Sequence, residues 1–118
     1  MPNDRFVISQ EKKVHVLKLS LPDGIDAMEI DTVIDGVLTG LSDKAKEKWI
    51  TDLSDVTYMG SAMLGLMVNI RQRIRSAGGK LILCGMKPQL LKIFQTCCLE
   101  RLFEITKTRA DAIAQASR

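Results

Sequence analysis

Extended segments and helical segments alternate along most of this chain, and that alternation limits the folds open to it. Two extended segments, 5–9 and 14–21, come first with a polar turn between them, which predicts a hairpin. Further strands are expected at 49–53, 80–84 and 102–105, and helices begin near 26, 61, 88 and 108. Strands joined through helices pair in parallel by right-handed crossovers. The sequence therefore predicts an α/β fold with a mixed, mainly parallel sheet of about five strands and about four helices.

Local signals indicate where several of these elements begin and end. Asp26 and Glu29 have the spacing of a capping box at the start of a helix. Pro88 suits a first helical position, and Gly78 ends the helix before it. The segment Lys80–Cys84 is almost fully apolar, which is typical of a strand covered on both faces. The expected apolar faces of the second and third helices comprise Met63, Met67, Ile70, Ile74 and Ala77, and Leu90, Leu91, Phe94, Cys97 and Cys98.

Composition excludes several classes of protein. Hydrophobic residues make up 46% of the 118 positions, which is enough for one domain with its own core. The net charge is only +3, and the aromatic residues, 4% of the chain, are scattered. Nucleic-acid-binding domains usually cluster cations on one face and add stacking aromatics. We therefore expect no direct contact with nucleic acid.

Cysteine usage and hydropathy bear on the compartment. The three cysteines are an odd number and two of them are adjacent, which does not suit a disulfide framework. A reducing cytoplasm fits this pattern best. The first ten residues are polar and mixed, and the longest apolar run, 62–68, is far shorter than the roughly 20 residues that span a bilayer. We expect a cytoplasmic protein without membrane insertion.

Nucleotide-binding motifs are incomplete. Gly78-Gly79-Lys80 resembles half of a phosphate-binding loop, but Ile74 and Leu81 stand where that loop needs Gly and Ser or Thr. The fragment also leads from a helix to a strand, which is the reverse of the required order. The chain contains no Gly-x-Gly-x-x-Gly, so a dinucleotide fold has no support.

Side chains suited to catalysis or metal binding are few. His15 is the only histidine, and we expect it to be a sheet-surface residue because no Cys/His spacing supplies partners for it. The vicinal pair Cys97-Cys98 is capable of redox chemistry, yet it fits a buried helix face better. We predict a protein that is not an enzyme and that uses no metal and no cofactor.

Residues 51–65 resemble the signature of STAS domains, the family of anti-sigma-factor antagonists and their relatives. The family pattern is a strand ending Asp-hydrophobic-Ser, a short loop, then hydrophobic-Asp-Ser-Ser/Thr-Gly-Leu-Gly opening a helix. Residues 78–85 look like the family's Gly-Gly-strand block, 98–103 are similar to its Gly-Leu-Asp-x-Leu-Phe ending, and 23–26 fit the turn before its first helix. The resemblance implies a STAS-type fold and a single STAS domain over 1–118, with a core at about 5–107 and a C-terminal helix at about 108–116.

The resemblance also implies a function and a site. In antagonist members the serine after the family aspartate is the regulatory phosphorylation site, and its position here is Ser61. The implied partner is an anti-sigma factor that is also a serine kinase; phosphorylation would break the complex, and a phosphatase would reset it. A helix start favours an anionic group, and phosphate adds about −1.5 to −2 charges. The expected partner surface comprises Asp23, Gly24, Asp26, Met59, Gly60, Ser61 and Ala62.

The chain departs from the family pattern beside the expected phosphorylation site. Gly60 replaces the aspartate, Ala62 replaces the second hydroxyl residue, and Met63 replaces the next glycine. Two interpretations of Ser61 therefore stay open. It is either a regulated phosphosite or a plain helix N-cap, whose loss would cost about 0.5–2 kcal/mol.

Other functions remain open as alternatives. A STAS domain that is never phosphorylated would be a scaffold, or an accessory subunit of a stress-signalling or lipid-transport complex. A small-ligand or nucleotide binder is a third hypothesis, although no sequence feature marks a pocket. Arg71, Arg73 and Arg75 form either a solvated basic face or a surface for an acidic partner. The sequence leaves the identity of the partner and the oligomeric state open.

Overall fold

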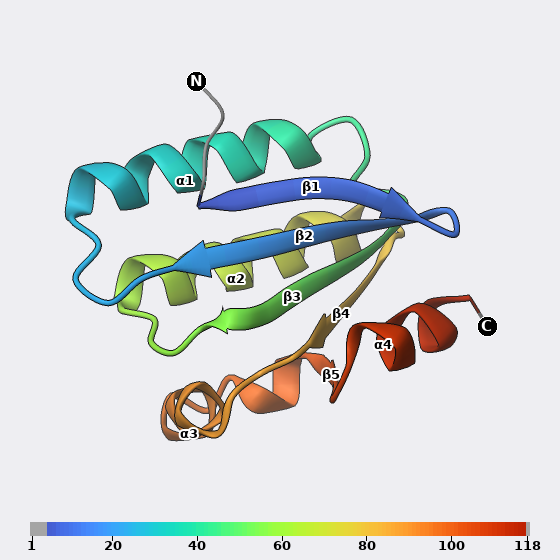
Figure 1. Ribbon diagram of the computed structural model, residues 1–118. Coiled ribbons are helices and arrows are strands. Elements are labelled where there is room, and N and C mark those ends of the chain that lie inside the picture. The colour runs from blue at the N-terminus through green and yellow to red at the C-terminus, as the bar shows by residue number, and fades with distance from the viewer. Residues whose placement is uncertain (1–4, 118) are drawn as a thin grey trace.

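The computed structural model describes residues 5–117, and its strands and helices follow the expected order (Figure 1). Each helix lies between two strands or after the last one, as the alternation predicts. The elements are β1 (Phe6–Glu11), β2 (Val14–Leu21), α1 (Ala27–Leu41), β3 (Lys48–Val56), α2 (Ser61–Ser76), β4 (Lys80–Cys84), α3 (Pro88–Thr96), the short 3-10 helix η1 (Glu100–Leu102), β5 (Glu104–Thr106) and α4 (Arg109–Ala116).

The five strands form one sheet in the order β1-β2-β3-β4-β5. β1 pairs with β2 in antiparallel fashion, and the remaining three pairs are parallel. Lys12 and Lys13 connect β1 to β2 with φ angles of 49° and 68°, the left-handed backbone of a tight two-residue hairpin turn. The predicted hairpin and the mixed, mainly parallel sheet are both confirmed.

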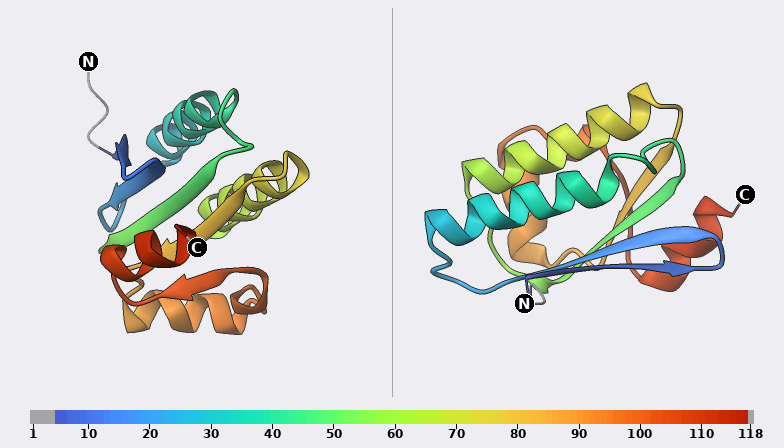
Figure 2. Two further views of the ribbon diagram at one scale, coloured as in Figure 1. Left: turned by 90° about the vertical axis from the view of Figure 1, so that its right-hand side faces the viewer. Right: turned by 90° about the horizontal axis from the view of Figure 1, so that it is seen from above.

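Helices cover both faces of the sheet. α1 and α2 lie side by side on one face and α4 lies on the other (Figure 2). Alternate side chains of a strand point to opposite faces. Leu17 and Leu83 therefore pack into the main cluster with α1, α2 and α3, whereas Val16 and Ile82 pack into a smaller cluster beneath α4.

The helix caps are largely those that the sequence predicts. The Asp26 carboxylate accepts a hydrogen bond from the Glu29 amide at 2.8 Å, so Asp26 is the N-cap of α1. The Glu29 side chain pairs with Arg5 at 2.9 Å, so that pair takes the place of the reciprocal half of a capping box. Thr108 caps α4 by accepting from the Asp111 amide at 3.1 Å.

The bounds of three strands differ from the expectation: β1 is Phe6–Glu11 and not 5–9, and β3 and β5 differ as well. β3 continues to Val56, three residues past the expected end at Leu53, because Ser20 and Leu21 of β2 extend the pairing. The last strand is Glu104–Thr106 and not 102–105, since Leu102 closes a 3-10 turn. Pairing with a neighbouring strand decided where β3 ends and where β5 lies, and the local sequence does not contain that information.

Three residues expected on apolar helix faces are exposed instead. Ala77 is the C-cap of α2 and lies outside its buried stripe. Cys97 is the C-cap of α3, and Cys98 follows it with a φ of 59°. Both cysteines are exposed because the helix ends before the periodicity would bring them round to the core. The prediction that they pack as small apolar residues is wrong.

His15 is buried, contrary to its expected place on the sheet surface. Its side chain is only 6% exposed and stacks on Trp49 with ring centroids 4.8 Å apart. The Nε2 atom lies 2.6 Å from the Glu47 carboxylate, and this hydrogen bond helps to hold the pKa of Glu47 below its ordinary value. His15 is therefore a partnered structural histidine.

Candidate functional site

The predicted partner residues lie on two neighbouring loops at the carboxyl end of the sheet. One loop follows β2 and contains Asp23, and the other follows β3 and leads to α2. Parallel β2 and β3 bring the two loops to the same edge (Figure 1). The Thr57 hydroxyl donates a hydrogen bond to the Asp23 carboxylate at 2.9 Å, which joins the loops directly. In open α/β sheets this edge is where ligands usually bind.

Ser61 is the first residue of α2 and is exposed. The N-cap is Gly60, with φ −82° and ψ −178°, so Ser61 lies one position inside the helix. The interpretation of Ser61 as the N-cap is therefore wrong. Among residues 5–117 no side chain caps this end of α2, and the first turn of the helix contains no acidic residue. The first amides of a helix carry a partial positive charge, and here no side chain compensates it.

Gly60 does not need to be a glycine for backbone reasons. Its φ is negative, and an added Cβ would meet only the Tyr58 side chain, a ring carbon at 3.8 Å and the hydroxyl oxygen at 3.9 Å. Those are ordinary van der Waals distances. The position of the family aspartate is therefore open to a side chain, and an aspartate there would reach the amides of the first turn.

The seven expected partner residues differ in what they present to solvent. Asp23, Gly24, Asp26, Ser61 and Ala62 are exposed and Gly60 is half-buried. Met59 is 2% exposed and belongs to the core, so its side chain is not available to a partner. The other methionines weighed as a soft partner surface also pack inward: Met63 and Met67 are buried, and Met86 packs against the same core.

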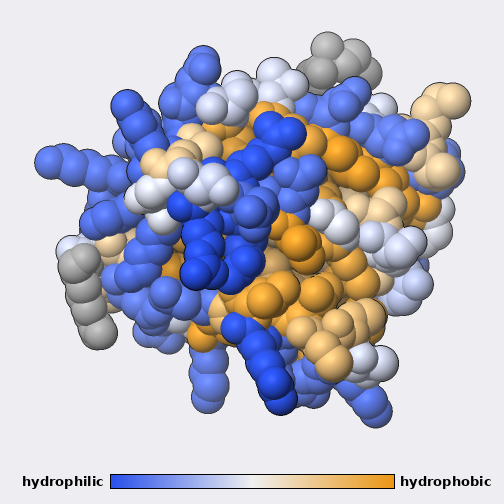
Figure 3. Space-filling model, turned by 180° about the vertical axis from the view of Figure 1, so that it is seen from behind, coloured by the Kyte–Doolittle hydropathy of each residue, from blue (hydrophilic) through white to orange (hydrophobic). Residues whose placement is uncertain are grey.

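Sequence reasoning missed two large hydrophobic side chains near these loops. Tyr58 is 63% exposed and follows Thr57, and Met28 is 79% exposed in the first turn of α1. Met28 could have been found, because it lies off the helical stripe of Val33, Val37 and Leu41. Figure 3 shows that the face seen from behind exposes hydrophobic residues next to an area of hydrophilic side chains. Apolar groups exposed beside a polar rim are suited to protein contacts.

Metal sites and membrane spans are absent from the described range. Among residues 5–117, no three His, Cys, Asp or Glu side chains gather closely enough to hold a metal ion. No helix in that same range is both long and apolar enough to cross a bilayer. The site is thus a surface of two loops and a helix start.

The STAS domain family model matches residues 7–112, so the chain belongs to the STAS domain family. Relatives that are 26% identical to it include one from Bordetella and one from Listeria. BtrV of Bordetella bronchiseptica matches over 81 residues, which are 69% of this chain and 70% of the relative's own length. The anti-sigma-B factor antagonist of Listeria monocytogenes matches over 86 residues, which are 73% of this chain and 67% of the relative's own length.

Solved structures share the fold. An anti-sigma-factor antagonist (STAS) domain protein from Planctomyces limnophilus has a TM-score of 0.84 at 20% identity, covering 96% of this chain and 98% of its own. The phosphorylated form of the Bacillus cell fate determinant SpoIIAA has a TM-score of 0.67 at 20% identity, covering 93% and 97%. The STAS-type fold expected from the sequence is confirmed.

Proposed function

We propose that this chain is an anti-sigma-factor antagonist, a binding module that sequesters an anti-sigma factor and loses that partner when Ser61 is phosphorylated. The observation that carries the proposal is Ser61 itself, exposed at the first position of a helix whose start has no side-chain cap and no acidic residue. The kinase would be the anti-sigma factor, a phosphatase would reverse the reaction, and the chain would perform no chemistry. The Listeria relative with an antagonist's name supports this direction.

A phosphoryl group at Ser61 has a clear physical consequence. It would bring about −1.5 to −2 charges and three acceptor oxygens to the uncompensated amides of the first turn of α2. The helix start stabilises that charge, so the domain keeps its fold. A partner docked over Ser61, Ala62 and Asp23 would then meet a new, solvated dianion and lose affinity. The phosphorylated SpoIIAA structure supports the compatibility of this fold with a phosphoryl group.

The direct test begins with the protein from its native cell. Intact-mass analysis with peptide mapping across Ser61 should detect a single phosphate under some growth or stress condition. A chain that stays unmodified under every condition would contradict the switch. Binding is then compared for Ser61→Ala and Ser61→Asp against the co-purified anti-sigma factor, with Ser9→Asp as a charge control on the exposed face of β1. Equal binding by both Ser61 variants would also refute the switch.

A second candidate function is favoured by Gly60 and Ala62, which stand where the family has an acidic and a hydroxyl residue. A STAS domain without a working phosphosite would be a constitutive scaffold or an accessory subunit, in a stress-signalling or a lipid-transport complex. The genes next to this one separate the candidates. A kinase or phosphatase gene supports the antagonist, and a transporter ATPase with a permease supports the accessory subunit.

A further inference from the structure

Exposed lysines gather at the amino end of the parallel strands, where the hairpin turn lies beside the starts of β3 and β4 (Figure 1). Lys12 and Lys13 form the turn. Together with Lys46 and with Lys48, the first residue of β3, they border a hollow of about 490 Å³. β3 is nine residues long, so about 30 Å of strand separates this surface from the loop that leads to Ser61.

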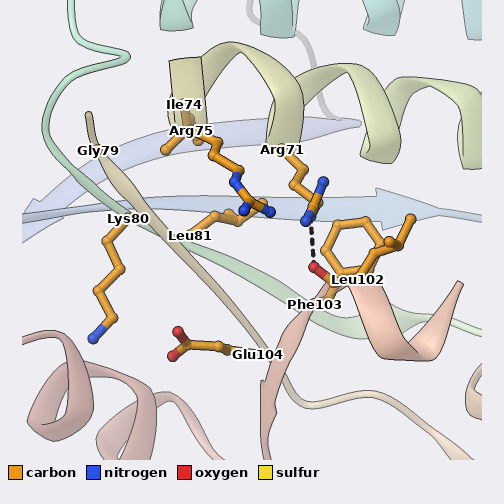
Figure 4. Close-up of a pocket in the computed structure, with 9 residues that line it drawn as sticks. All are labelled: Arg71, Ile74, Arg75, Gly79, Lys80, Leu81, Leu102, Phe103 and Glu104. Carbon is orange, nitrogen blue, oxygen red and sulfur yellow. Dashed lines mark hydrogen bonds between the residues drawn. The ribbon is translucent and has the colours of Figure 1, made fainter. Parts of the chain in front are cut away.

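A fifth lysine extends this surface. Lys80 opens β4 and is the register partner of Lys48, so both side chains leave the sheet on the face that α4 covers. Figure 4 shows that Lys80 points away from Arg71 and Arg75 and toward Glu104. The two arginines therefore belong to a different face of the molecule. We call the following five residues the basic end: Lys12, Lys13, Lys46, Lys48 and Lys80.

The charge of the basic end is not neutralised within residues 5–117. None of its five side chains makes an ion pair or a hydrogen bond in that range. The two carboxylates beside them are engaged by other side chains, since Glu47 lies 2.6 Å from the His15 ring nitrogen and Glu104 accepts from Gln115 at 2.6 Å. Five cations and two carboxylates leave three net positive charges. The whole chain has a net charge of +3, so its remaining charges balance.

Two features of the basic end are unfavourable for stability. Lys12 and Lys13 have left-handed backbones, with φ angles of 49° and 68°, in a kind of turn that favours Asn-Gly. Lys48 and Lys80 place like charges on directly paired positions of neighbouring strands. Backbone strain and charge repulsion that the fold does not need indicate a functional constraint. A negatively charged partner accounts for these lysines, and the fold does not.

The residue types select the kind of partner. The basic end contains no arginine and no aromatic residue, and no exposed large hydrophobic side chain borders its hollow. Nucleic-acid surfaces add arginine and stacking aromatics, and stable membrane attachment needs an apolar anchor besides the charges. Carboxylates of a protein segment need neither, because lysine attracts them as a point charge.

We infer that the basic end is a docking surface for an acidic segment of a partner protein. Asp23, Asp26 and Asp55 are exposed at the opposite end of the sheet, so charge also directs such a segment away from Ser61. The chain is thereby able to hold this segment while the Ser61 end is occupied by another protein. The inference does not rest on the switch proposed above, because phosphorylation of Ser61 involves none of these lysines.

The test is a titration of the isotope-labelled full chain with an octaglutamate peptide at constant ionic strength, read by NMR amide shifts. Constant ionic strength is needed because salt screens exposed charges. We expect saturable shifts centred on Lys12, Lys13, Lys46 and Lys48, with a Kd on the order of 0.1 mM. Shifts that fail to saturate by about 2 mM, or that centre on α2 instead, would overturn the inference.

Charge variants make the test specific. Lys13→Gln with Lys48→Gln should weaken octaglutamate binding at least about fivefold. Lys92→Gln with Lys107→Gln removes the same charge from exposed lysines outside the basic end and should leave the Kd within about twofold. Ser61→Asp should also leave it within about twofold, because its charge is several Debye lengths away. Equal weakening by both double variants would show general charge attraction and refute the surface.

A turn variant separates stability from binding. Lys12→Asn with Lys13→Gly introduces the preferred turn sequence, so the midpoint of thermal unfolding should rise. The same variant removes two cations, so octaglutamate binding should weaken at least about fivefold. Unchanged binding would show that the turn lysines do not contact the peptide and would contradict the inference.

Two other polyanions test the kind of partner. Octathymidylate and vesicles that contain phosphatidylglycerol are titrated under the same conditions as octaglutamate. Binding of both that is no tighter than that of octaglutamate supports an acidic protein segment. Binding of either one that is at least about tenfold tighter assigns the basic end to nucleic acid or to a membrane, and the inference fails.

Discussion

Arg109 donates two hydrogen bonds to the Oδ2 atom of Asp52, at 3.1 Å from Nε and 2.8 Å from Nη2. The bond joins the first turn of α4 to the middle of β3, 57 positions away in the chain. Asp52 is only 7% exposed and its other carboxylate oxygen accepts from the Ser54 amide at 2.9 Å. This pair of a buried carboxylate and a partly exposed guanidinium holds α4 against the sheet.

Replacing Arg109 should therefore destabilise the fold. Arg109→Met keeps much of the side-chain volume but leaves the Asp52 carboxylate buried without its cation. Breaking a fully buried pair costs about 3–5 kcal/mol, and the partly exposed Arg109 reduces the expectation to about 2–3 kcal/mol. Urea unfolding measures the change. Arg101→Met, at an exposed arginine without a side-chain partner in the described chain, is the control and should change the free energy of unfolding by less than about 0.5 kcal/mol.

The same pair makes stability depend on pH. Burial by itself raises the pKa of Asp52, but hydrogen bonds from Ser54 and Arg109 and the charge of Arg109 outweigh it and hold the pKa below its ordinary value of 3.8. A depressed pKa stabilises the fold above the ordinary value and loses that effect as the pH falls through the folded value. The stability difference between the wild type and Asp52→Asn should shrink below about pH 4 in urea unfolding. A difference that stays constant with pH would contradict this.

Substitutions at Gly60 and Ser61 should have different effects on stability. Ser61→Ala should change the free energy of unfolding by less than about 0.5 kcal/mol, since Ser61 is not the cap and alanine is a good helix former. Gly60→Asp should stabilise by about 0.5–1 kcal/mol, because it supplies a cap and a negative charge at an uncapped helix start. Thermal and urea unfolding give both values. A loss of about 1 kcal/mol or more in Ser61→Ala would restore the cap interpretation.

Cys98 adopts a left-handed backbone that glycine adopts without strain. Its φ is 59°, and Leu99 beyond it donates its amide to the Phe94 carbonyl at 2.8 Å, the pattern of a helix C-terminal cap. The STAS family motif that residues 98–103 resemble has a glycine at this position. Cys98→Gly should stabilise by about 0.5–1 kcal/mol in urea unfolding. Cys97→Gly, at a φ of −86°, is the matched control and should destabilise.

The three thiols should differ in reactivity. Burial, followed by the negative charge of Asp52, raises the pKa of Cys84 to about 12, so its thiol stays protonated at neutral pH. Cys97 and Cys98 are exposed. A thiol-reactive chromogenic disulfide should titrate two thiols in the native protein and the third only in denaturant. Rapid reaction of all three in the native state would show that Cys84 is accessible.

Much of the fold could be predicted because its signals are local. The hairpin turn at Lys12 and Lys13, the cap at Asp26 and the stop at Gly78 each depend on interactions within a few residues. The family motif likewise located Ser61 at the start of α2. Nothing local, however, distinguishes an apolar residue that faces the core from one just past a helix end, as Cys97 and Cys98 show.

The sequence by itself determined the order of the elements, the helix caps and the family. The hydrophobic period and the capping interactions depend on residues that are neighbours in the chain, so they can be identified without the tertiary structure. Only the tertiary structure decided which distant groups meet. It buried Met59 and His15 and paired Asp52 with Arg109. Burial and charge pairing depend on segments that are far apart in the chain and become neighbours only when the sheet closes and the helices pack on it.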